Sequence, residues 1–253
     1  MELFNREFGQ GPPLLIVHGL FGSSDNWYSI AKKFSQDFTV HTIDLRNHGN
    51  SPHHDEFNYK IMTRDLDHYL KRKGIIKASI IGHSMGGKLA MNFTLKNPKR
   101  IQNLVVVDIA PRPYPVHHDL IIDSLLELNL QKYKKRDEVD EALSDMIPSI
   151  RIRQFLLKNL KREENGGFTW KINLKAINDN IENIVSEITS KKSFNGKTLF
   201  IAGDKSDYIR PVDEEQILNL FPKAEVIYLP KVGHWVHAEA PDLLYNTIID
   251  YIK

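Results

Sequence analysis

Gly82-His83-Ser84-Met85-Gly86-Gly87 is the stretch of this 253-residue sequence that decides its fold. It lies directly after residues 78–81, an apolar run typical of a buried strand, and directly before residues 88–97, a helical pattern. A serine between glycines in a strand–turn–helix context indicates a nucleophile elbow, because larger flanking side chains would collide with the strand and the helix. We therefore predict that Ser84 is a catalytic nucleophile with an exposed hydroxyl. A serine that merely caps the helix is the alternative.

Apolar runs rich in Val and Ile alternate with helical patterns on both sides of this stretch. Such alternation is typical of a mostly parallel sheet that is covered by helices on both faces. The expected strands are residues 14–17, 40–43, 78–81, 104–107, 198–201 and 226–229. The expected helices are residues 26–34, 59–73, 88–97, 214–219 and 241–252. The succession predicts an α/β fold.

The alternation is interrupted between residues 111 and 195, where charged, helix-like segments occur and no strand pattern is found. The segment starts with a Pro-rich turn and contains a break at Asn165-Gly166-Gly167. Because so short a segment would have a marginal core of its own, we expect an insertion rather than a second, independent helical domain, which stays the alternative. The predicted organisation is a core of residues 1–110 and 196–253 with a helical cap, or lid, of residues 111–195.

A serine hydroxyl is a poor nucleophile until a base takes its proton, so a histidine must reach it from elsewhere in the chain. His234 is the best placed of the 11 histidines. It lies between the last strand and the last helix, where enzymes with a nucleophile elbow carry their base. His53, His54, His117 and His118 are in polar loops and are expected to be solvated. The histidines that could compete lie in the elbow, in polar loops or one turn further along: His53, His54, His83, His117, His118 and His237.

The tetrahedral oxyanion of acyl transfer needs hydrogen-bond donors that are fixed in advance, and backbone N–H groups provide them. One is the N–H of Met85, directly after the nucleophile. The second is expected in the loop after the first core strand, His18-Gly19-Leu20-Phe21-Gly22-Ser23, where glycines let the backbone approach a substrate. Leu20 is the preferred donor, with Phe21 behind it.

Three aspartates are candidates for the third member of the triad, which accepts a hydrogen bond from the imidazole. The usual position is a G-x-x-D turn after the later strand, but Gly203-Asp204-Lys205-Ser206-Asp207 has a serine at that spacing. Asp108 instead ends the predicted strand of residues 104–107, on the same carboxyl edge as the nucleophile. Geometry favours Asp108 and leaves Asp207 and Asp204 open.

Asp44 and Arg46, in a loop that ends another strand at this edge, are interpreted as organising the loop rather than as an acid and a base. No metal-binding pattern and no dinucleotide-binding G-x-G-x-x-G is found, and the chain has no cysteine, so we predict neither a metal nor a cofactor. A formal net charge of +2 gives no argument for a nucleic-acid or membrane partner. No apolar run approaches the roughly 20 residues of a membrane span, so a cytoplasmic location is expected.

Five stretches together form a set of motifs: LIVHGLFGSSDNW at 15–27, DLRNHG at 44–49, GHSMGGK at 82–88, VDIAP at 107–111 and GHWVHAE at 233–239. This set resembles the YbfF-type bacterial esterases of the α/β-hydrolase superfamily, and the resemblance spans nearly the whole chain. It implies an α/β-hydrolase fold with a helical cap and carboxylesterase activity on short to medium acyl esters, and it leaves thioesterase activity on acyl-CoA open. In that family the triad acid is the aspartate of the VDIAP motif, which is Asp108 here. Asp207 departs from the family, which usually has an uncharged residue there.

The sequence therefore predicts a serine carboxylesterase whose partner is a small-molecule acyl ester or thioester. Its predicted site comprises the triad Ser84, His234 and Asp108, the oxyanion donors Leu20 and Met85, and the substrate-binding residues Phe21, Trp235 and Phe155. Because one scaffold can support several functions, two alternatives stay open. One is another reaction on the same scaffold, such as C–C bond hydrolysis or a lyase step. The other is a ligand receptor with little turnover.

Overall fold

The structure, a computed structural model, describes residues 1–116, 119–164 and 166–253. Two of the histidines expected to be solvated, His117 and His118, lie outside the described residues, as does Asn165, the first residue of the predicted break; the other two, His53 and His54, are exposed.

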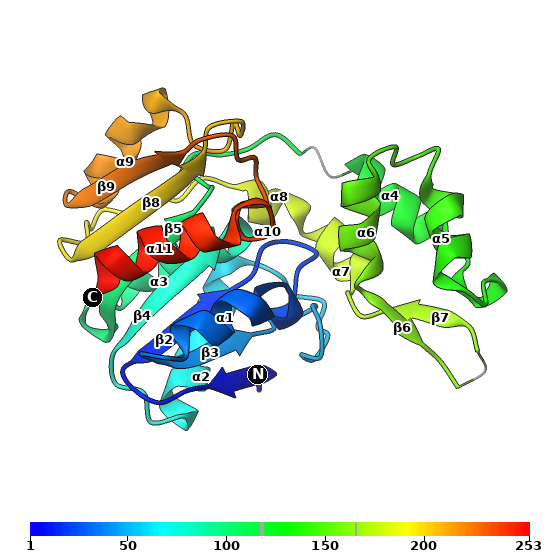
Figure 1. The fold of residues 1–253 in the computed structure, drawn as a ribbon, viewed down its shortest axis with the longest axis horizontal. Coiled ribbons are helices and arrows are strands. Elements are labelled where there is room, and N and C mark those ends of the chain that lie inside the picture. Colours follow the sequence, from blue (N-terminus) through cyan, green and yellow to red (C-terminus); the bar gives the residue numbers. More distant parts are fainter. Residues whose placement is uncertain (117–118, 165) are drawn as a thin grey trace.

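A seven-stranded sheet forms the centre of the molecule, with the strand order β1-β3-β2-β4-β5-β8-β9 (Figure 1). Among the strand pairs that the structure describes in this sheet, β1 and β3 are antiparallel and all others are parallel. Its strands are β1 (Asn5–Phe8), β2 (Pro13–Val17), β3 (Thr39–Ile43), β4 (Ala78–His83), β5 (Ile101–Val107), β8 (Lys197–Gly203) and β9 (Ala224–Leu229). Six of the seven were predicted from the sequence.

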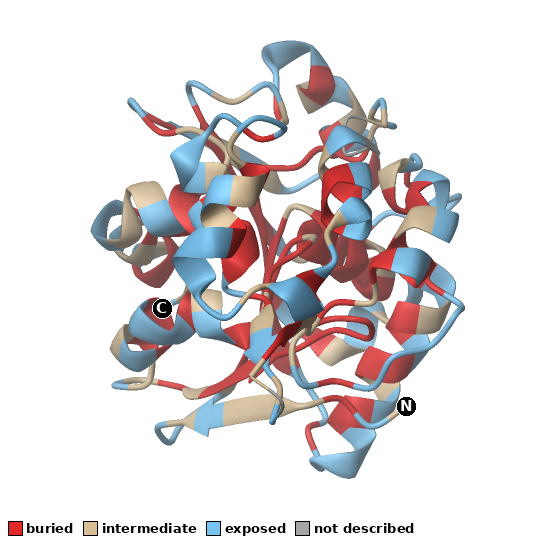
Figure 2. Cartoon of the chain, turned by 90° about the vertical axis from the view of Figure 1, so that its right-hand side faces the viewer, coloured by how far each residue is buried: buried red, intermediate tan, exposed pale blue. Residues whose placement is uncertain are grey.

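Helices cover both faces of the sheet, because successive side chains of a strand point to opposite faces and both sets are apolar. In β2, Leu14 and Ile16 pack in the same apolar cluster as α1 (Tyr28–Phe34) and α11 (Pro241–Ile252). Leu15 and Val17 belong to the opposite cluster. That second face is covered by α2 (Tyr59–Arg72), α3 (Met85–Lys96) and α9 (Glu214–Leu220). Figure 2 shows the buried residues gathered in the interior of the molecule and the exposed ones on its outer surface.

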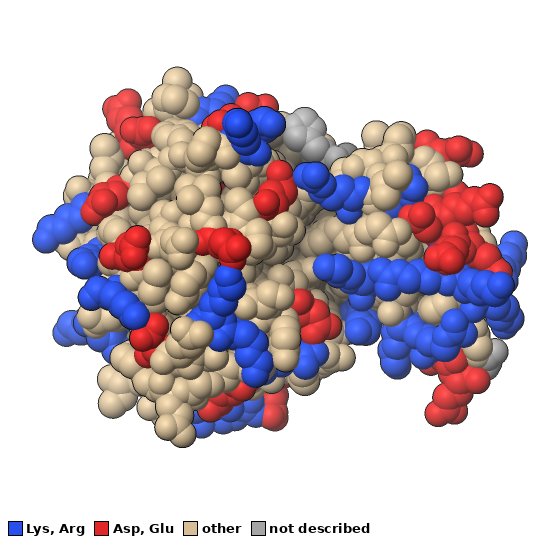
Figure 3. Space-filling model, viewed as in Figure 1, with Lys and Arg blue, Asp and Glu red and all other residues tan. Residues whose placement is uncertain are grey.

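The elements between β5 and β8 are called the cap below; in Figure 1 most of them form a lobe that lies apart from the sheet, and α8 is drawn between that lobe and the sheet. It contains α4 (Asp119–Glu127), α5 (Arg136–Leu143), α6 (Ile150–Leu157), β6 (Leu160–Arg162), β7 (Phe168–Trp170), α7 (Leu174–Asp179) and α8 (Ile181–Val185). One buried apolar cluster runs from the sheet into this lobe. Figure 3 shows Lys and Arg in a band across the cap with acidic side chains on either side. The face in view is therefore not of a single charge.

The expectation that no strand occurs in this segment was wrong, because β6 and β7 pair as an antiparallel hairpin. Each strand is three residues long, and two of the three residues of β6 are the exposed Lys161 and Arg162. A strand so short and so polar has no apolar run that a sequence pattern could detect.

The two chain segments that join the cap to the core are bonded to each other. The N–H of Tyr114 donates to the carbonyl of Val185 at 2.9 Å, and the N–H of Ile188 donates to the carbonyl of Pro111 at 2.8 Å. The ammonium of Lys88, from α3 of the core, donates to the carbonyl of Arg112 at 2.8 Å and to that of Ser186. The two connecting segments, residues 111–114 and 185–188, are called the hinge below. They are bonded to each other and to the buried ammonium of Lys88. No helix in the described part of the chain is both long enough and apolar enough to cross a bilayer.

Candidate active site

Ser84 lies in a turn that only small neighbours permit. Its φ is +52°, a left-handed conformation that is rare for a residue with a side chain. α3 begins at the next residue, so strand and helix meet at the serine. A Cβ at Gly82 would lie 2.3 Å from the carbonyl oxygen of Gly86, and a Cβ at Gly86 would lie 2.4 Å from that of His18. The Ser84 side chain makes no helix-capping hydrogen bond, so the capping alternative is wrong.

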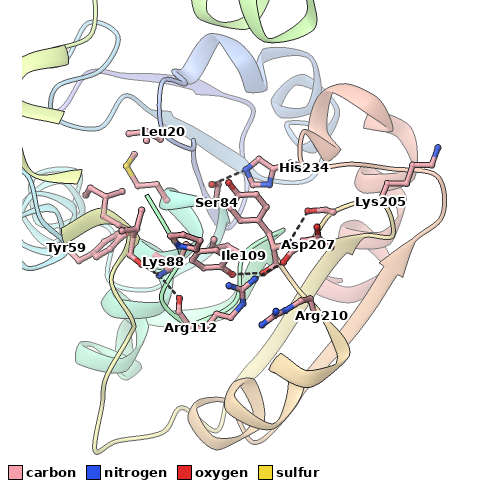
Figure 4. A pocket seen from close by; sticks show the side chains of 17 residues that line it. Leu20, Tyr59, Ser84, Lys88, Ile109, Arg112, Lys205, Asp207, Arg210 and His234 are labelled. Atoms are coloured by element: carbon pink, nitrogen blue, oxygen red, sulfur yellow. Dashed lines mark hydrogen bonds between the residues drawn. The ribbon is translucent and has the colours of Figure 1, made fainter. Parts of the chain in front are cut away.

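Ser84, His234 and Asp108 are joined by hydrogen bonds. The oxygen Oγ of Ser84 lies 3.2 Å from Nε2 of His234, and Nδ1 of His234 lies 2.7 Å from Oδ2 of Asp108. Because an ionised carboxylate only accepts, the Nδ1 proton points to Asp108 and Nε2 is left to accept the serine proton. Figure 4 shows Ser84 and His234 facing each other. The arrangement is that of a nucleophile, a base and an orienting acid.

The Asp108 carboxylate is fully buried and is held by three donors. Oδ1 accepts the N–H of Gly203 at 2.9 Å, while Oδ2 accepts the hydroxyl of Ser206 at 2.5 Å and the imidazole of His234. Ser206 is the serine that replaces the acid of the G-x-x-D turn. The sequence showed this replacement but not its role. Ser206 orients the carboxylate of Asp108, the residue that follows β5.

The two rival aspartates do not contact the imidazole. The carboxylate of Asp204 accepts the N–H of Val232 at 3.1 Å. Asp207 is exposed, and its backbone carbonyl accepts a hydrogen bond from Arg112 at 2.7 Å. Neither carboxylate has a hydrogen bond to His234 within the described residues, so the structure brings Asp108 to the base and leaves the other two apart.

The backbone N–H groups of Leu20 and Met85 lie beside Ser84, and neither has a protein acceptor among the described residues. The N–H of Phe21, the alternative donor, is engaged, since it donates to Nε2 of His48 at 3.2 Å. The loop lies directly against the nucleophile, because a Cβ at Gly19 would be 3.1 Å from Cβ of Ser84. The N–H groups of Leu20 and Met85, the expected donors, are thus available to an oxyanion, whereas that of Phe21 is engaged.

Two buried histidines connect the loop of residues 18–23 to the loop after β3. Nε2 of His18 accepts the N–H of Leu45 at 3.0 Å, as Nε2 of His48 accepts that of Phe21. Burial lowers the pKa of His18 to about 4 and the pKa of His48 to about 3, so both rings are neutral near pH 7 and can accept. Asp44 accepts the N–H of Ser24 at 2.6 Å. This is the structural role inferred for Asp44 from the sequence.

Arg46 is also buried and paired. Its guanidinium contacts both carboxylate oxygens of Asp65, at 2.6 and 3.0 Å. With both groups almost fully buried, this bidentate pair fixes the loop after β3 and is not available for acid–base chemistry.

Two cavities open on Ser84. The first, about 480 Å³, lies beside the hinge and is called the hinge cavity; its lining includes Lys88, Arg112 and Tyr114. The second, about 250 Å³, lies under α4 and α6 and is called the cap cavity; its lining includes Ile121 and Ile152. The three residues predicted to bind substrate all line the cap cavity: Phe21, Phe155 and Trp235. The hinge cavity was missed, because its walls come from segments more than 100 residues apart in the chain.

An aromatic stack packs against the imidazole at the place where the two cavities meet. The ring of Tyr208 lies 3.9 Å from that of His234 with an interplanar angle of 20°, and Tyr114 stacks on Tyr208 at 5.1 Å. Tyr208 lines both cavities. Sequence analysis missed it, since no pattern marks a tyrosine that stacks on a histidine 26 residues later.

The competing histidines of the described chain have other partners. His83 contacts the backbone carbonyl of His234 through Nε2 at 2.9 Å, and burial keeps its pKa well below the usual value. His237 stacks on Trp27 at 4.8 Å, and burial lowers its pKa to about 3. Neither has a hydrogen bond to Ser84 in the described structure, so His234 alone of these three is placed to act on the hydroxyl.

Comparison with known proteins was consistent across sequence and structure. Residues 12–138 match the family model described as alpha/beta hydrolase fold. The chain is 39% identical over 253 residues to the "sn-1-specific diacylglycerol lipase ABHD11" of Danio rerio, which covers 97% of this chain and 80% of the relative. It is 35% identical over 242 residues to "Esterase YbfF" of Escherichia coli, covering 95% and 93%. A solved structure described as "Marine microorganism esterase" superposes with a TM-score of 0.97 at 42% identity, covering 99% of both chains.

Proposed function

The chain belongs to the α/β-hydrolase family and acts on ester bonds, and we propose that it does so as a serine carboxylesterase working through an acyl-enzyme. The observation that carries the proposal is the continuous set of hydrogen bonds from Ser84 through His234 to Asp108, at the point where two cavities meet. Serine, base and buried acid are the parts that this mechanism needs.

Acylation follows from this geometry. As Oγ of Ser84 attacks the carbonyl carbon of the ester, its proton passes to Nε2 of His234. The carbonyl oxygen becomes an oxyanion, which accepts hydrogen bonds from the N–H groups of Leu20 and Met85. The imidazolium, stabilised by the Asp108 carboxylate, then gives the proton to the alcohol oxygen as the ester C–O bond breaks.

Deacylation repeats these steps with water. The neutral His234 takes a proton from a water molecule, whose oxygen attacks the acyl carbon on Ser84. The second tetrahedral oxyanion occupies the same two N–H groups. When it collapses, Oγ of Ser84 leaves and recovers the proton from Nε2, and the carboxylic acid is released.

The proposal gives the cap cavity to the acyl group and the hinge cavity to the leaving group. The cap cavity is the smaller and is lined by Phe21, Phe155, Ile152 and Trp235, which suits a short to medium acyl chain. In this proposal residues 1–110 and 196–253 are the catalytic core, and residues 111–195 are a cap that completes the substrate site.

A thioester of an anionic thiol, such as an acyl-CoA, is the second substrate class. Arg112, Lys205 and Arg210 line the hinge cavity, and Figure 4 shows Arg112 and Arg210 on the same side of it. Both arginines are already paired with the carboxylate of Asp213, however. The two arginines share this one carboxylate, and the carboxylate of Asp207 lines the cavity together with Lys205. The net positive charge of these groups is therefore small, and the simple ester remains the first proposal.

The test is hydrolysis of p-nitrophenyl esters from acetate to decanoate, and of acyl-CoAs of the same lengths. We expect turnover that Ser84→Ala lowers by at least about 10⁴-fold, with the protein still folded. Wild-type turnover by Ser84→Ala would refute the proposal. A single burst without steady-state hydrolysis would favour the receptor, and poor turnover of every ester and thioester would favour a C–C hydrolase or a lyase.

A further inference from the structure

One side chain of the cap reaches into the core and bonds to the loop that carries Leu20. The side-chain amide of Asn159 donates from Nδ2 to the backbone carbonyl of Phe21 at 2.8 Å, over a separation of 138 residues. Asn159 is 3% exposed, and the same Nδ2 also donates to the carbonyl of Leu156 at 3.1 Å. Asn159 therefore ties the carboxyl end of α6 to the loop after β2.

The loop at that point adopts a conformation that its sequence does not favour. The N–H of Gly22 donates to the carbonyl of Gly19 at 3.0 Å, which closes a four-residue turn with Leu20 and Phe21 at its centre. Phe21 has a φ of +59°. A positive φ at the third position of a turn suits glycine or asparagine, and a phenylalanine there is strained. Such a conformation persists only where the surroundings hold it.

Phe21 is held from two sides. His48, from the loop after β3, accepts its N–H at 3.2 Å, and Asn159, from the cap, donates to its carbonyl at 2.8 Å. All three residues are buried, so the loss of either bond would leave a buried polar group of Phe21 without that partner, at a cost in free energy. The proposed oxyanion donor is the N–H of Leu20, at the second position of the same turn. The direction of the Leu20 N–H therefore depends on the conformation of this turn.

We propose that Asn159 is a positioning residue that sets the oxyanion hole from the cap, so that seating of α6 on the core completes the site. This inference rests on the proposed function and extends it to the cap. α6 also supplies Ile152, Phe155 and Leu156 to the cap cavity. An acyl group that fills this cavity packs against α6, and so holds Asn159 on the carbonyl of Phe21. Acyl contacts with the cap then increase kcat and not only binding.

The chain offers a matched control for this bond. Asn180, at the end of α7 in the cap, donates from Nδ2 to the carbonyl of Asp55 in the core at 2.9 Å and to the carbonyl of Ala176 in its own helix at 2.8 Å. Its two bonds have the same chemistry as those of Asn159, but they lead to a loop that carries no proposed oxyanion donor. Asn180→Ala therefore removes a tie between cap and core without touching the turn at Phe21.

The experiment compares wild type, Asn159→Ala and Asn180→Ala on p-nitrophenyl acetate and hexanoate. Removal of one oxyanion donor costs roughly 10²–10³ in kcat, and a donor that is displaced rather than removed costs less, about tenfold. We expect Asn159→Ala to lower kcat on hexanoate about tenfold with KM within about twofold, and Asn180→Ala to change either constant less than about twofold. Affinity for a hexyl trifluoromethyl ketone, whose adduct with Ser84 carries an oxyanion, should fall in Asn159→Ala in proportion to kcat.

Acyl length gives a readout that a merely structural role would not change. In wild type, kcat should rise from acetate to hexanoate, and in Asn159→Ala this rise should disappear. Equal kcat values for the two variants, or a loss in Asn159→Ala confined to KM, would overturn the inference. If Asn159→Ala does not fold, Asn159→Asp, which keeps the shape but not the amide, carries the same comparison. Absence of ester hydrolysis in wild type would instead refute the proposed function, and the inference with it.

Discussion

Moving the triad acid from one strand to its neighbour tests the geometry of the site most directly. Asp108, after β5, and Ser206, after β8, meet at one oxygen: Oδ2 of Asp108 accepts both the Ser206 hydroxyl and the His234 imidazole. In Asp108→Asn, an amide replaces the carboxylate that accepts the Nδ1–H bond of His234. If the amide turns its NH2 toward Nδ1, the imidazole can no longer be held in the tautomer that leaves Nε2 free to accept the serine proton. A loss of about 10⁴-fold in kcat is expected for such a change, which is about 5.5 kcal/mol of transition-state stabilisation.

The second substitution restores the charge from the other side. Ser206→Asp in the Asp108→Asn background places a carboxylate where the Ser206 hydroxyl now lies. That hydroxyl bonds to the same oxygen of Asp108 that contacts His234, so the new carboxylate lies close to the imidazole. We expect about 10²-fold recovery of kcat, less than complete because the new carboxylate lacks the N–H of Gly203 as an anchor. Steady-state hydrolysis of p-nitrophenyl butyrate by the two single variants and the double variant measures this, with far-UV circular dichroism to verify folding.

Asp207→Asn is the matched control. Its carboxylate is exposed and makes no hydrogen bond to His234 among the described residues, so kcat should stay within about twofold of wild type. The reasoning is refuted if Asp207→Asn loses more activity than Asp108→Asn, or if the double variant is no better than Asp108→Asn alone.

Two further predictions concern the rings around the site. Burial lowers the pKa of His18, His48 and His237 from 6.5 to about 4, 3 and 3, so the unfolded chain binds more protons as the pH falls below 6.5 and folding loses stability. Each of these three costs about 1.4 kcal/mol at pH 5.5, and His83, whose pKa burial also lowers well below 6.5, adds to the loss. Urea unfolding should therefore give a free energy at least about 4 kcal/mol lower at pH 5.5 than at pH 8, and His237→Phe should reduce this difference by about 1.4 kcal/mol; a flat profile would contradict this. Removing the ring that stacks on the imidazole in Tyr208→Ala should lower kcat up to about tenfold, whereas Tyr208→Phe should stay within about twofold, and equal losses would show that the hydroxyl matters instead.

The sheet was predictable because both faces of its strands are buried. Residues 14–17 and 104–107 form apolar runs that local pattern alone identifies as strands, within β2 and β5. β1 was missed, since Asn5-Arg6-Glu7-Phe8 is polar and pairs only at the edge of the sheet. The β6–β7 hairpin was missed for the same reason. An edge or hairpin strand is stabilised by pairing with a partner, and its own sequence need not show it.

Within the site, residues that directly follow a strand could be predicted from the sequence. Residues whose role depends on a contact with a distant segment, such as Ser206 and Tyr208, could not. Ser84, Asp108 and His234 stand at strand ends or after the last strand, where the order along the chain carries information. The choice between Asp108 and Asp207 could not be made from order alone, because β5 and β8 are neighbours and both end at the same edge. The structure distinguishes them by contact, since the buried carboxylate of Asp108 lies 2.7 Å from Nδ1 of His234, while Asp207 is exposed and has no hydrogen bond to His234 among the described residues.

The register of the sheet explains why serine and acid are fixed more firmly than the base. His83 pairs with Val107 across β4 and β5, so Ser84 and Asp108 are the next residues of the same cross-strand row. Each has a left-handed φ, +52° and +53°. The backbone bonds continue past the strands, from Ser84 N–H to the carbonyl of Val107 at 3.0 Å and from Asp108 N–H to that of Ile201 at 2.7 Å.

His234 is not held by backbone hydrogen bonds to a neighbouring strand in this way, because it lies in the loop after β9. Its place depends on side chains: the ring of Tyr208 against one face, the Asp108 carboxylate at Nδ1, and His83 on its carbonyl. Since the serine and the acid are fixed by the core sheet, loosening of the site should begin at the base and at the turn of Phe21, which is held by side chains as well. Substitutions that reduce kcat without unfolding the protein should therefore cluster around these two places, whereas substitutions in β4 and β5 should destabilise the fold before they alter the chemistry.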